Sequence, residues 1–185
     1  MAEVTITKGI NDLKKIFSQM NKIYFMKTPN QALTAITTFD LELPVLESGV
    51  AFKSAEAQTT KTKLTSGSLW DVTAKSGDDD ISYQTASLDP LVLSTFLDAT
   101  VSGVDMTSTV NGITYTGYGI STDPKKVLGS LFMTSQDLSC AIYLPNTQIF
   151  SNLVNEENKP AYINSKVSAL NDLTGKNIYV LHKKV

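Results

Sequence analysis

Short apolar segments separated by turn residues make up most of the chain after Phe39, and this pattern constrains the fold more than any other feature. In several segments apolar and polar residues alternate, as in a strand with one buried face, and turn signals recur roughly every 8–12 residues. The predicted strands are Phe39–Leu43, Val50–Phe52, Thr59–Thr65, Ser68–Ala74, Ile81–Thr85, Ile113–Tyr118, Val127–Thr134, Cys140–Leu144, Gln148–Val154, Pro160–Leu170 and Asn177–His182. The sequence therefore predicts a mainly β fold, a β-sandwich or barrel.

One segment within this pattern predicts a flanking α-helix. Asp89 is a preferred N-cap residue and Pro90 suits the first helical position, so a helix is expected over residues 90–99. Its expected buried face consists of Leu91, Val92 and Phe96, with Leu93 as a further candidate. The segment Thr100–Thr109 that follows is polar and is interpreted as a connector.

The beginning of the chain predicts an additional N-terminal helix. A stripe of apolar residues recurs there at steps of three and four, which is the period of an amphipathic helix. The stripe consists of Ile10, Leu13, Phe17, Met20 and Tyr24. We expect a helical arm within residues 1–28, beginning near Gly9, although the apolar run 23–26 fits a strand equally well. No segment is long enough to be a linker between domains, so a single domain over residues 1–185 is expected.

The predicted hairpin over residues 59–75, within an extended region 57–86, has no face that could cover a core. Lys61 and Lys63 lie on one side of its first strand, and the other side carries two threonines and Leu64. A hairpin of this kind is marginal on its own in water. Two interpretations stay open: the hairpin contacts neighbouring copies in a ring or tube, or it is a solvent-exposed edge protected by lysines.

The charges argue against a protein that grips nucleic acid. All 16 cationic side chains are lysines, arginine is absent, and the formal net charge is −2. Arginine is the usual residue for bidentate contacts with phosphates and base edges. The charges are unevenly spread, with an acidic stretch over residues 71–105 between more basic ends. One face of such a chain can pair with another face of a second copy.

The search for catalytic, cofactor and metal sites gives none. His182 lies close to the end of the sequence and is expected to be frayed, and Cys140 has the neighbours of a buried strand residue. Asp78, Asp79 and Asp80 lack the spacing of a calcium loop and are interpreted as a solvated turn. Gly117-Tyr118-Gly119 lacks the lysine and further glycine of a phosphate-binding loop. We therefore expect no enzyme, no cofactor and no metal.

Aromatic side chains alternate along several of the predicted strands. They are Tyr115, Tyr118, Phe132, Tyr143 and Phe150, and they are expected to form core or cross-strand contacts. No apolar stretch approaches the roughly 18 residues of a membrane span, so no membrane partner is expected. The opening residues do not have the basic and apolar regions of a signal peptide, so none is expected.

The order of these elements resembles that of bacteriophage tail tube (major tail) proteins. The first part of the resemblance is Thr60–Leu97, with a polar hairpin, a Gly-Asp turn, a strand and an Asp-Pro-capped helix. The second part is Lys126–Leu170, with the paired strands Val127–Thr134 and Ala141–Leu144 ending in a break at Pro145-Asn146. The resemblance covers residues 39–182.

The resemblance implies a virion structural protein that assembles into stacked hexameric rings around a lumen that conducts DNA during ejection. It implies as partners further copies of the chain, other tail or connector proteins, and double-stranded DNA that passes without specific binding. The expected location is the virion tail, after synthesis in the host cytoplasm. The expected architectural elements are the hairpin 59–75 at an inter-subunit wall, Asp78–Asp80 near a polar rim, and the helix 90–99 against the sandwich. The alternatives are another virion component (a head–tail connector or capsid decoration protein) or a soluble ligand-binding β-sandwich.

Overall fold

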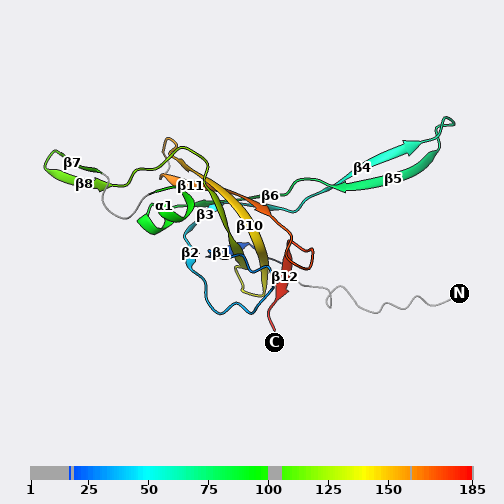
Figure 1. Cartoon of the computed structure of the whole chain (residues 1–185), viewed down its shortest axis with the longest axis horizontal. Coiled ribbons are helices and arrows are strands. Elements are labelled where there is room, and N and C mark those ends of the chain that lie inside the picture. Colours follow the sequence, from blue (N-terminus) through cyan, green and yellow to red (C-terminus); the bar gives the residue numbers. More distant parts are fainter. Residues whose placement is uncertain (1–16, 18, 100–105, 159, 185) are drawn as a thin grey trace.

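The chain folds mainly as β-structure with one α-helix, as a computed structural model shows for residue 17 and residues 19–99, 106–158 and 160–184 (Figure 1). The strands are β1 (Met20–Met26), β2 (Leu41–Leu43), β3 (Val45–Lys53), β4 (Ala57–Lys63), β5 (Leu69–Ser76), β6 (Asp80–Thr85), β7 (Met106–Val110), β8 (Ile113–Gly117), β9 (Lys126–Ser135), β10 (Cys140–Val154), β11 (Tyr162–Ala169) and β12 (Tyr179–His182). The helix is α1 (Pro90–Phe96). The predicted fold class is thereby confirmed at the level of a mainly β chain with a flanking helix.

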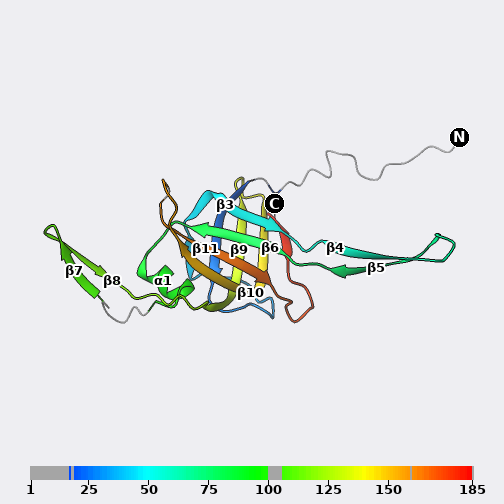
Figure 2. The ribbon, with the colours of Figure 1, turned by 90° about the horizontal axis from the view of Figure 1, so that it is seen from above.

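An eight-stranded antiparallel sheet forms the body of the molecule. Its order is β2-β1-β9-β10-β11-β6-β3. The eighth strand, β12, pairs with the first part of β10, and β11 pairs with the second part of β10. The sheet curls into a half-barrel, seen from above in Figure 2. The hairpins β4–β5 and β7–β8 form separate two-stranded sheets. Both views show them extending from opposite ends of the body.

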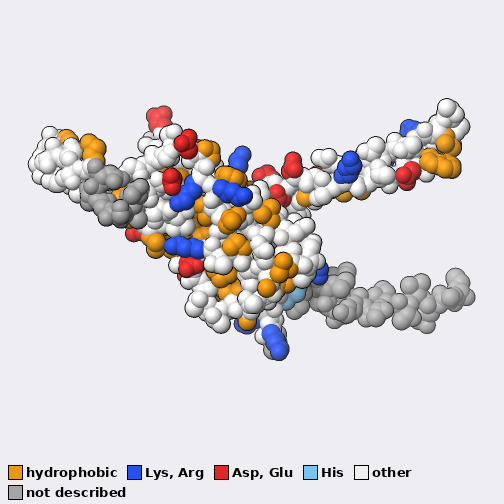
Figure 3. Space-filling view, viewed as in Figure 1, with side chains coloured by type: hydrophobic (Ala, Val, Ile, Leu, Met, Phe, Trp, Pro, Cys, Tyr) orange, Lys and Arg blue, Asp and Glu red, His pale blue; other side chains and the backbone are white. Residues whose placement is uncertain are grey.

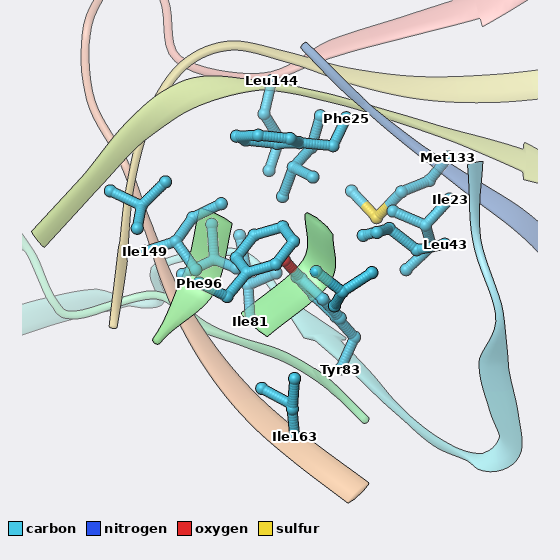
Figure 4. Close-up of a cluster of buried hydrophobic side chains, with 14 of the residues drawn as sticks. Ile23, Phe25, Leu43, Ile81, Tyr83, Phe96, Met133, Leu144, Ile149 and Ile163 are labelled. Carbon is cyan, nitrogen blue, oxygen red and sulfur yellow. The ribbon is translucent and has the colours of Figure 1, made fainter. Parts of the chain in front are cut away.

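The core fills the concave side of the curled sheet. Alternate residues of the central strands point inwards, as the two-residue period of a strand requires. Those in Figure 4 include Ile23, Phe25, Met133, Leu144 and Ile163, all of which are at most 1% exposed. Covering so much apolar surface is the main source of stability for a domain of this size.

Helix α1 covers one side of this core. The Asp89 carboxylate accepts a hydrogen bond from the Leu91 backbone nitrogen at 2.8 Å, and Pro90 occupies the first turn, as predicted. Phe96 packs against Phe25, with ring centroids 5.0 Å apart. The expected buried face is partly wrong, because Leu91 is 48% exposed, whereas Val92 and Phe96 are buried as predicted. The helix ends at Phe96, earlier than the predicted residue 99.

The expected N-terminal helix is not confirmed, and of the two interpretations left open for residues 23–26 the structure shows the strand. Residues Met20–Met26 form strand β1, which pairs with β2 on one side and β9 on the other. Ile23 and Phe25 are buried at the two-residue period of a strand. The apolar run satisfies both periods, and pairing with two neighbouring strands selects the extended form. Residues 1–16 and 18 lie outside the described part.

Two further expectations need correction. The Pro145-Asn146 break is absent: β10 runs through it, with a register shift between Leu144 and Thr147 that accommodates the proline, which has no N–H to donate. The predicted connector Thr100–Thr109 contains strand β7 from Met106 onwards, because Met106–Val110 pairs with β8. Residues 100–105 lie outside the described part.

Candidate assembly surfaces

The β4–β5 hairpin is exposed along its entire length. All seven residues of β4 and all eight residues of β5 are classed as exposed, and the two strands pair only with each other among the described strands. The turn uses Gly67 at φ 82°, a conformation that glycine adopts without steric cost. The hairpin predicted over 59–75 therefore exists, and neither of its faces is covered.

Apolar side chains gather near the tip of this hairpin (Figure 3). Trp70 is 71% exposed and lies at an irregularity of the register, where Thr62 pairs with Asp71 and Lys63 with Leu69. Leu64 and Leu69 are 44% and 57% exposed. Large apolar side chains grouped on a surface form a candidate contact site.

The acidic residues at the base of the hairpin form a junction with the body. The Asp79 carboxylate accepts a hydrogen bond from the Ala169 backbone nitrogen at 2.8 Å, and Gly77 N–H donates to the Glu56 carbonyl at 2.8 Å. The predicted acidic stretch 71–105 does not form one described surface, because Asp71 lies on the hairpin whereas Asp89 caps α1.

The β7–β8 hairpin has one apolar face and one threonine face. Directly opposed residues of an antiparallel pair share a face. Met106, Val110, Ile113 and Tyr115 share one face and are each more than half exposed. The opposite face consists of the pairs Thr107–Thr116 and Thr109–Thr114. No other described strand pairs with this hairpin.

Sequence reasoning missed this second hairpin, although a signal was available. Asn111 and Gly112 form its turn with φ values of 52° and 78°, and two positive φ angles are typical of a type I′ turn. An Asn-Gly pair between alternating segments is the strongest short-range hairpin signal. Of the two roles expected for Tyr115, the cross-strand one is confirmed, because it pairs with Ser108 on β7; at 56% exposed it is not a core residue, and Phe150 is 41% exposed.

A row of aromatic rings crosses the convex side of the main sheet. Phe39 stacks on Tyr24 with centroids 5.0 Å apart and lies 5.5 Å from Phe132, which in turn lies 6.0 Å from Tyr143. Beside the last two rings lies a groove of about 360 Å³. Its lining residues are Asn30, Leu33, Thr34, Ile36, Phe132, Tyr143, Tyr179 and Leu181, which we call the aromatic groove.

Hydrogen bonds hold the loop that forms one wall of the aromatic groove. The Asn30 side chain accepts from the Thr34 backbone nitrogen at 2.9 Å and donates to the Thr34 carbonyl at 2.8 Å. On the other wall, the Tyr179 hydroxyl donates to Asp172, which is only 7% exposed. Burial alone raises the pKa of Asp172, but hydrogen bonds from Tyr179, Lys176 N–H and Thr174 outweigh it and lower that pKa to about 2.

His182 is not frayed, contrary to expectation. It belongs to β12 and pairs with Cys140 of β10, and its Nδ1 atom lies 3.3 Å from the Cys140 sulfur. Cys140 is 4% exposed, which agrees with its interpretation as a buried strand residue. Within the described ranges, no three His, Cys, Asp or Glu side chains come together in a group suited to a metal ion.

No protein-family model matches this chain, and no curated protein matches it. In the part of the chain that the structure describes, no helix is long and apolar enough to span a membrane.

Proposed function

We propose that this protein is a virion structural protein, a tail tube subunit that self-assembles into stacked hexameric rings whose lumen conducts DNA during ejection. The observation that carries the proposal is the fully exposed β4–β5 hairpin. A lone hairpin is marginally stable in water, and Trp70 at 71% exposure gains from being covered. Neighbouring copies of the chain would provide the missing contacts.

The placement of the hairpins supports an assembly in which different surfaces of one copy meet. β4–β5 and β7–β8 extend from opposite ends of the half-barrel (Figures 1 and 2). An interface between two different patches is heterologous, and it generates a closed ring or an open stack of subunits. A tube built from stacked rings contains both arrangements, because the subunits of each ring form a closed circle and the rings form an open stack.

The charge of the chain supports transport of DNA without retention. A net charge of −2 and the absence of arginine give little attraction to phosphates. Each phosphate contact would slow the passage of DNA through a lumen. In this proposal the partners are further copies, other tail or connector proteins and passing DNA, and the location is the virion tail after synthesis in the host cytoplasm.

Electron microscopy and sedimentation of concentrated protein test the proposal. We expect rings or tubes, and we expect a variant in which a short Gly-Ser linker replaces residues 57–76 to keep its melting temperature but form neither. The melting temperature should persist because no residue of β4 or β5 is buried. A protein that sediments as a 20.1 kDa monomer at every concentration, with no rings or tubes, would contradict the proposal.

The aromatic groove supports a second candidate function, a soluble ligand-binding β-protein. Phe132, Tyr143 and Tyr179 line a concave site of about 360 Å³ that suits an apolar or carbohydrate ring. This candidate predicts a monomer whose melting temperature rises with a panel of sugars or aromatic ligands. If rings form, their position in the particle distinguishes a tube subunit from a connector or decoration protein.

A further inference from the structure

The apolar face of β7–β8 leaves a surface that the described part of its own chain does not cover. Met106, Val110, Ile113 and Tyr115 are 67%, 54%, 57% and 56% exposed. Together they expose on the order of 400 Å², about half of what each partner contributes to a standard protein interface. Because the opposite face carries only threonines, the hairpin has a defined docking side.

The aromatic groove has the properties of a receiving surface. Six of its eight lining residues are aliphatic or aromatic, and the other two are Asn30 and Thr34. Tyr143 itself is only 5% exposed. A concave and mostly apolar lining of this kind suits an apolar segment brought in by another chain.

The groove also ends at an open strand. Leu181 of β12 lies in its lining, and β12 pairs with β10 but with no other described strand. The free edge of such a strand offers backbone groups to an added strand. A two-stranded hairpin is the kind of element that can pair there while one of its faces fills the groove.

The two surfaces match in charge and lie apart on the chain. The hairpin from Met106 to Tyr118 contains no charged residue, and neither does the lining of the groove. Docking therefore removes no charge from water, which avoids a large penalty. The hairpin and β12 lie on opposite sides of the body in both ribbon views, so the hairpin of one chain lies far from the β12 edge of its own groove.

We propose that the β7–β8 hairpin of one copy docks with its apolar face into the aromatic groove of the next copy. This inference rests on the proposed self-assembly and identifies the surfaces that would carry one of its contacts. Since the two surfaces differ, each copy can give one hairpin and receive another, which extends the contact head to tail.

Charge substitutions on the two surfaces test the docking by sedimentation over a range of concentrations. Tyr115→Lys on the hairpin and Leu181→Lys in the groove should each weaken association at least about tenfold, because a lysine would be buried without a partner. The matched controls are Thr116→Lys on the threonine face and Val180→Lys on the opposite side of β12. Thr116 is exposed and Val180 is 60% exposed, so both controls should associate within about threefold of wild type.

Cross-linking keeps the test decisive if a lysine variant fails to fold. Mixing Ile113→Cys protein with Leu181→Cys protein and a short bis-maleimide should give a covalent dimer, whereas each variant alone should give no more dimer than wild type. Cys140 is buried, so it accounts only for the small amount of dimer that wild type itself gives. Equal dimer yields from the mixture and the separate variants would overturn the inference.

The outcomes also separate this inference from the proposed function. If rings form and Tyr115→Lys associates like wild type, the docking proposal fails while the proposed self-assembly stands. If Leu181→Lys weakens association and Tyr115→Lys does not, another segment occupies the groove and the docking proposal fails. If wild type stays monomeric at every concentration, both proposals fail.

Discussion

The Ser130 hydroxyl lies 2.9 Å from the backbone nitrogen of Asn30, 100 positions earlier in the chain, and so attaches the loop after β1 to strand β9. The same hydroxyl donates to the Pro145 carbonyl at 2.8 Å, and Asn30 N–H also points at that carbonyl, at 2.8 Å. Three segments therefore meet at one buried point, beside the irregularity of β10. This contact positions the Asn30 wall of the aromatic groove.

Replacing Ser130 by alanine should destabilise the fold. Ser130 is 1% exposed, so its loss leaves buried polar backbone groups with fewer partners, at a cost of about 1–3 kcal/mol in the free energy of unfolding. Urea titration measures this change. Ser66→Ala, at the exposed turn of β4–β5, should change the free energy by less than about 0.5 kcal/mol. Equal values for the two variants would contradict the role given to Ser130.

Gly129 should tolerate no side chain. A Cβ atom there would lie 2.5 Å from the Met26 carbonyl oxygen and overlap the Phe25 ring, because β9 and β1 approach closely at this point. Gly129→Ala should therefore lower the free energy of unfolding by about 1–3 kcal/mol in urea titrations. Gly117→Ala is the matched control, since a Cβ there meets no atom within 4 Å, and it should be nearly neutral. A neutral Gly129→Ala variant would contradict the close packing of β1 on β9.

Stability should fall in acid through Asp172. Its pKa is lowered to about 2 in the folded protein, against about 3.9 in an unfolded chain, so between these values the unfolded state binds more protons. The stabilisation is fully present above about pH 4 and is lost as the pH falls through 2. The difference in unfolding free energy between wild type and Asp172→Asn should shrink over that interval, as measured by urea titration at each pH. A difference independent of pH would contradict the hydrogen-bonded carboxylate.

Asp71→Asn is the control for the acid experiment. It removes a charge of the same sign from exposed strand β5 and leaves the hydrogen bonds of Asp172 intact. The Asp172→Asn variant should also show increased mobility of Tyr179, whose hydroxyl donates to the carboxylate.

Local signals predicted the elements whose conformation depends on nearby residues. Asp89 and Pro90 predicted the start of α1, and the Ser66-Gly67 turn with its polar flanks predicted a hairpin without a face that could cover a core. The same kind of reasoning could have found β7–β8 from Asn111 and Gly112. Of the two candidate assembly surfaces on hairpins, the sequence predicted one and carried a usable signal for the other.

The aromatic groove could not have been predicted in this way. Its lining joins residues 30–36, Phe132, Tyr143 and β12, which are far apart in the sequence and come together only through the pairing of β9, β10 and β12. Likewise, the contact between His182 and Cys140 depends on the register of β12 against β10.

The sequence by itself determined a mainly β chain with one capped helix and a hairpin unable to bury either face, because strand period, turn residues and capping act over a few residues. Only the tertiary structure decided that Met20–Met26 is a strand, that β10 passes through Pro145, and that Tyr115 is exposed while Tyr143 is buried. The physical reason is that an apolar run often fits more than one local conformation. Long-range strand pairing selects among these conformations and decides which apolar side chains are covered.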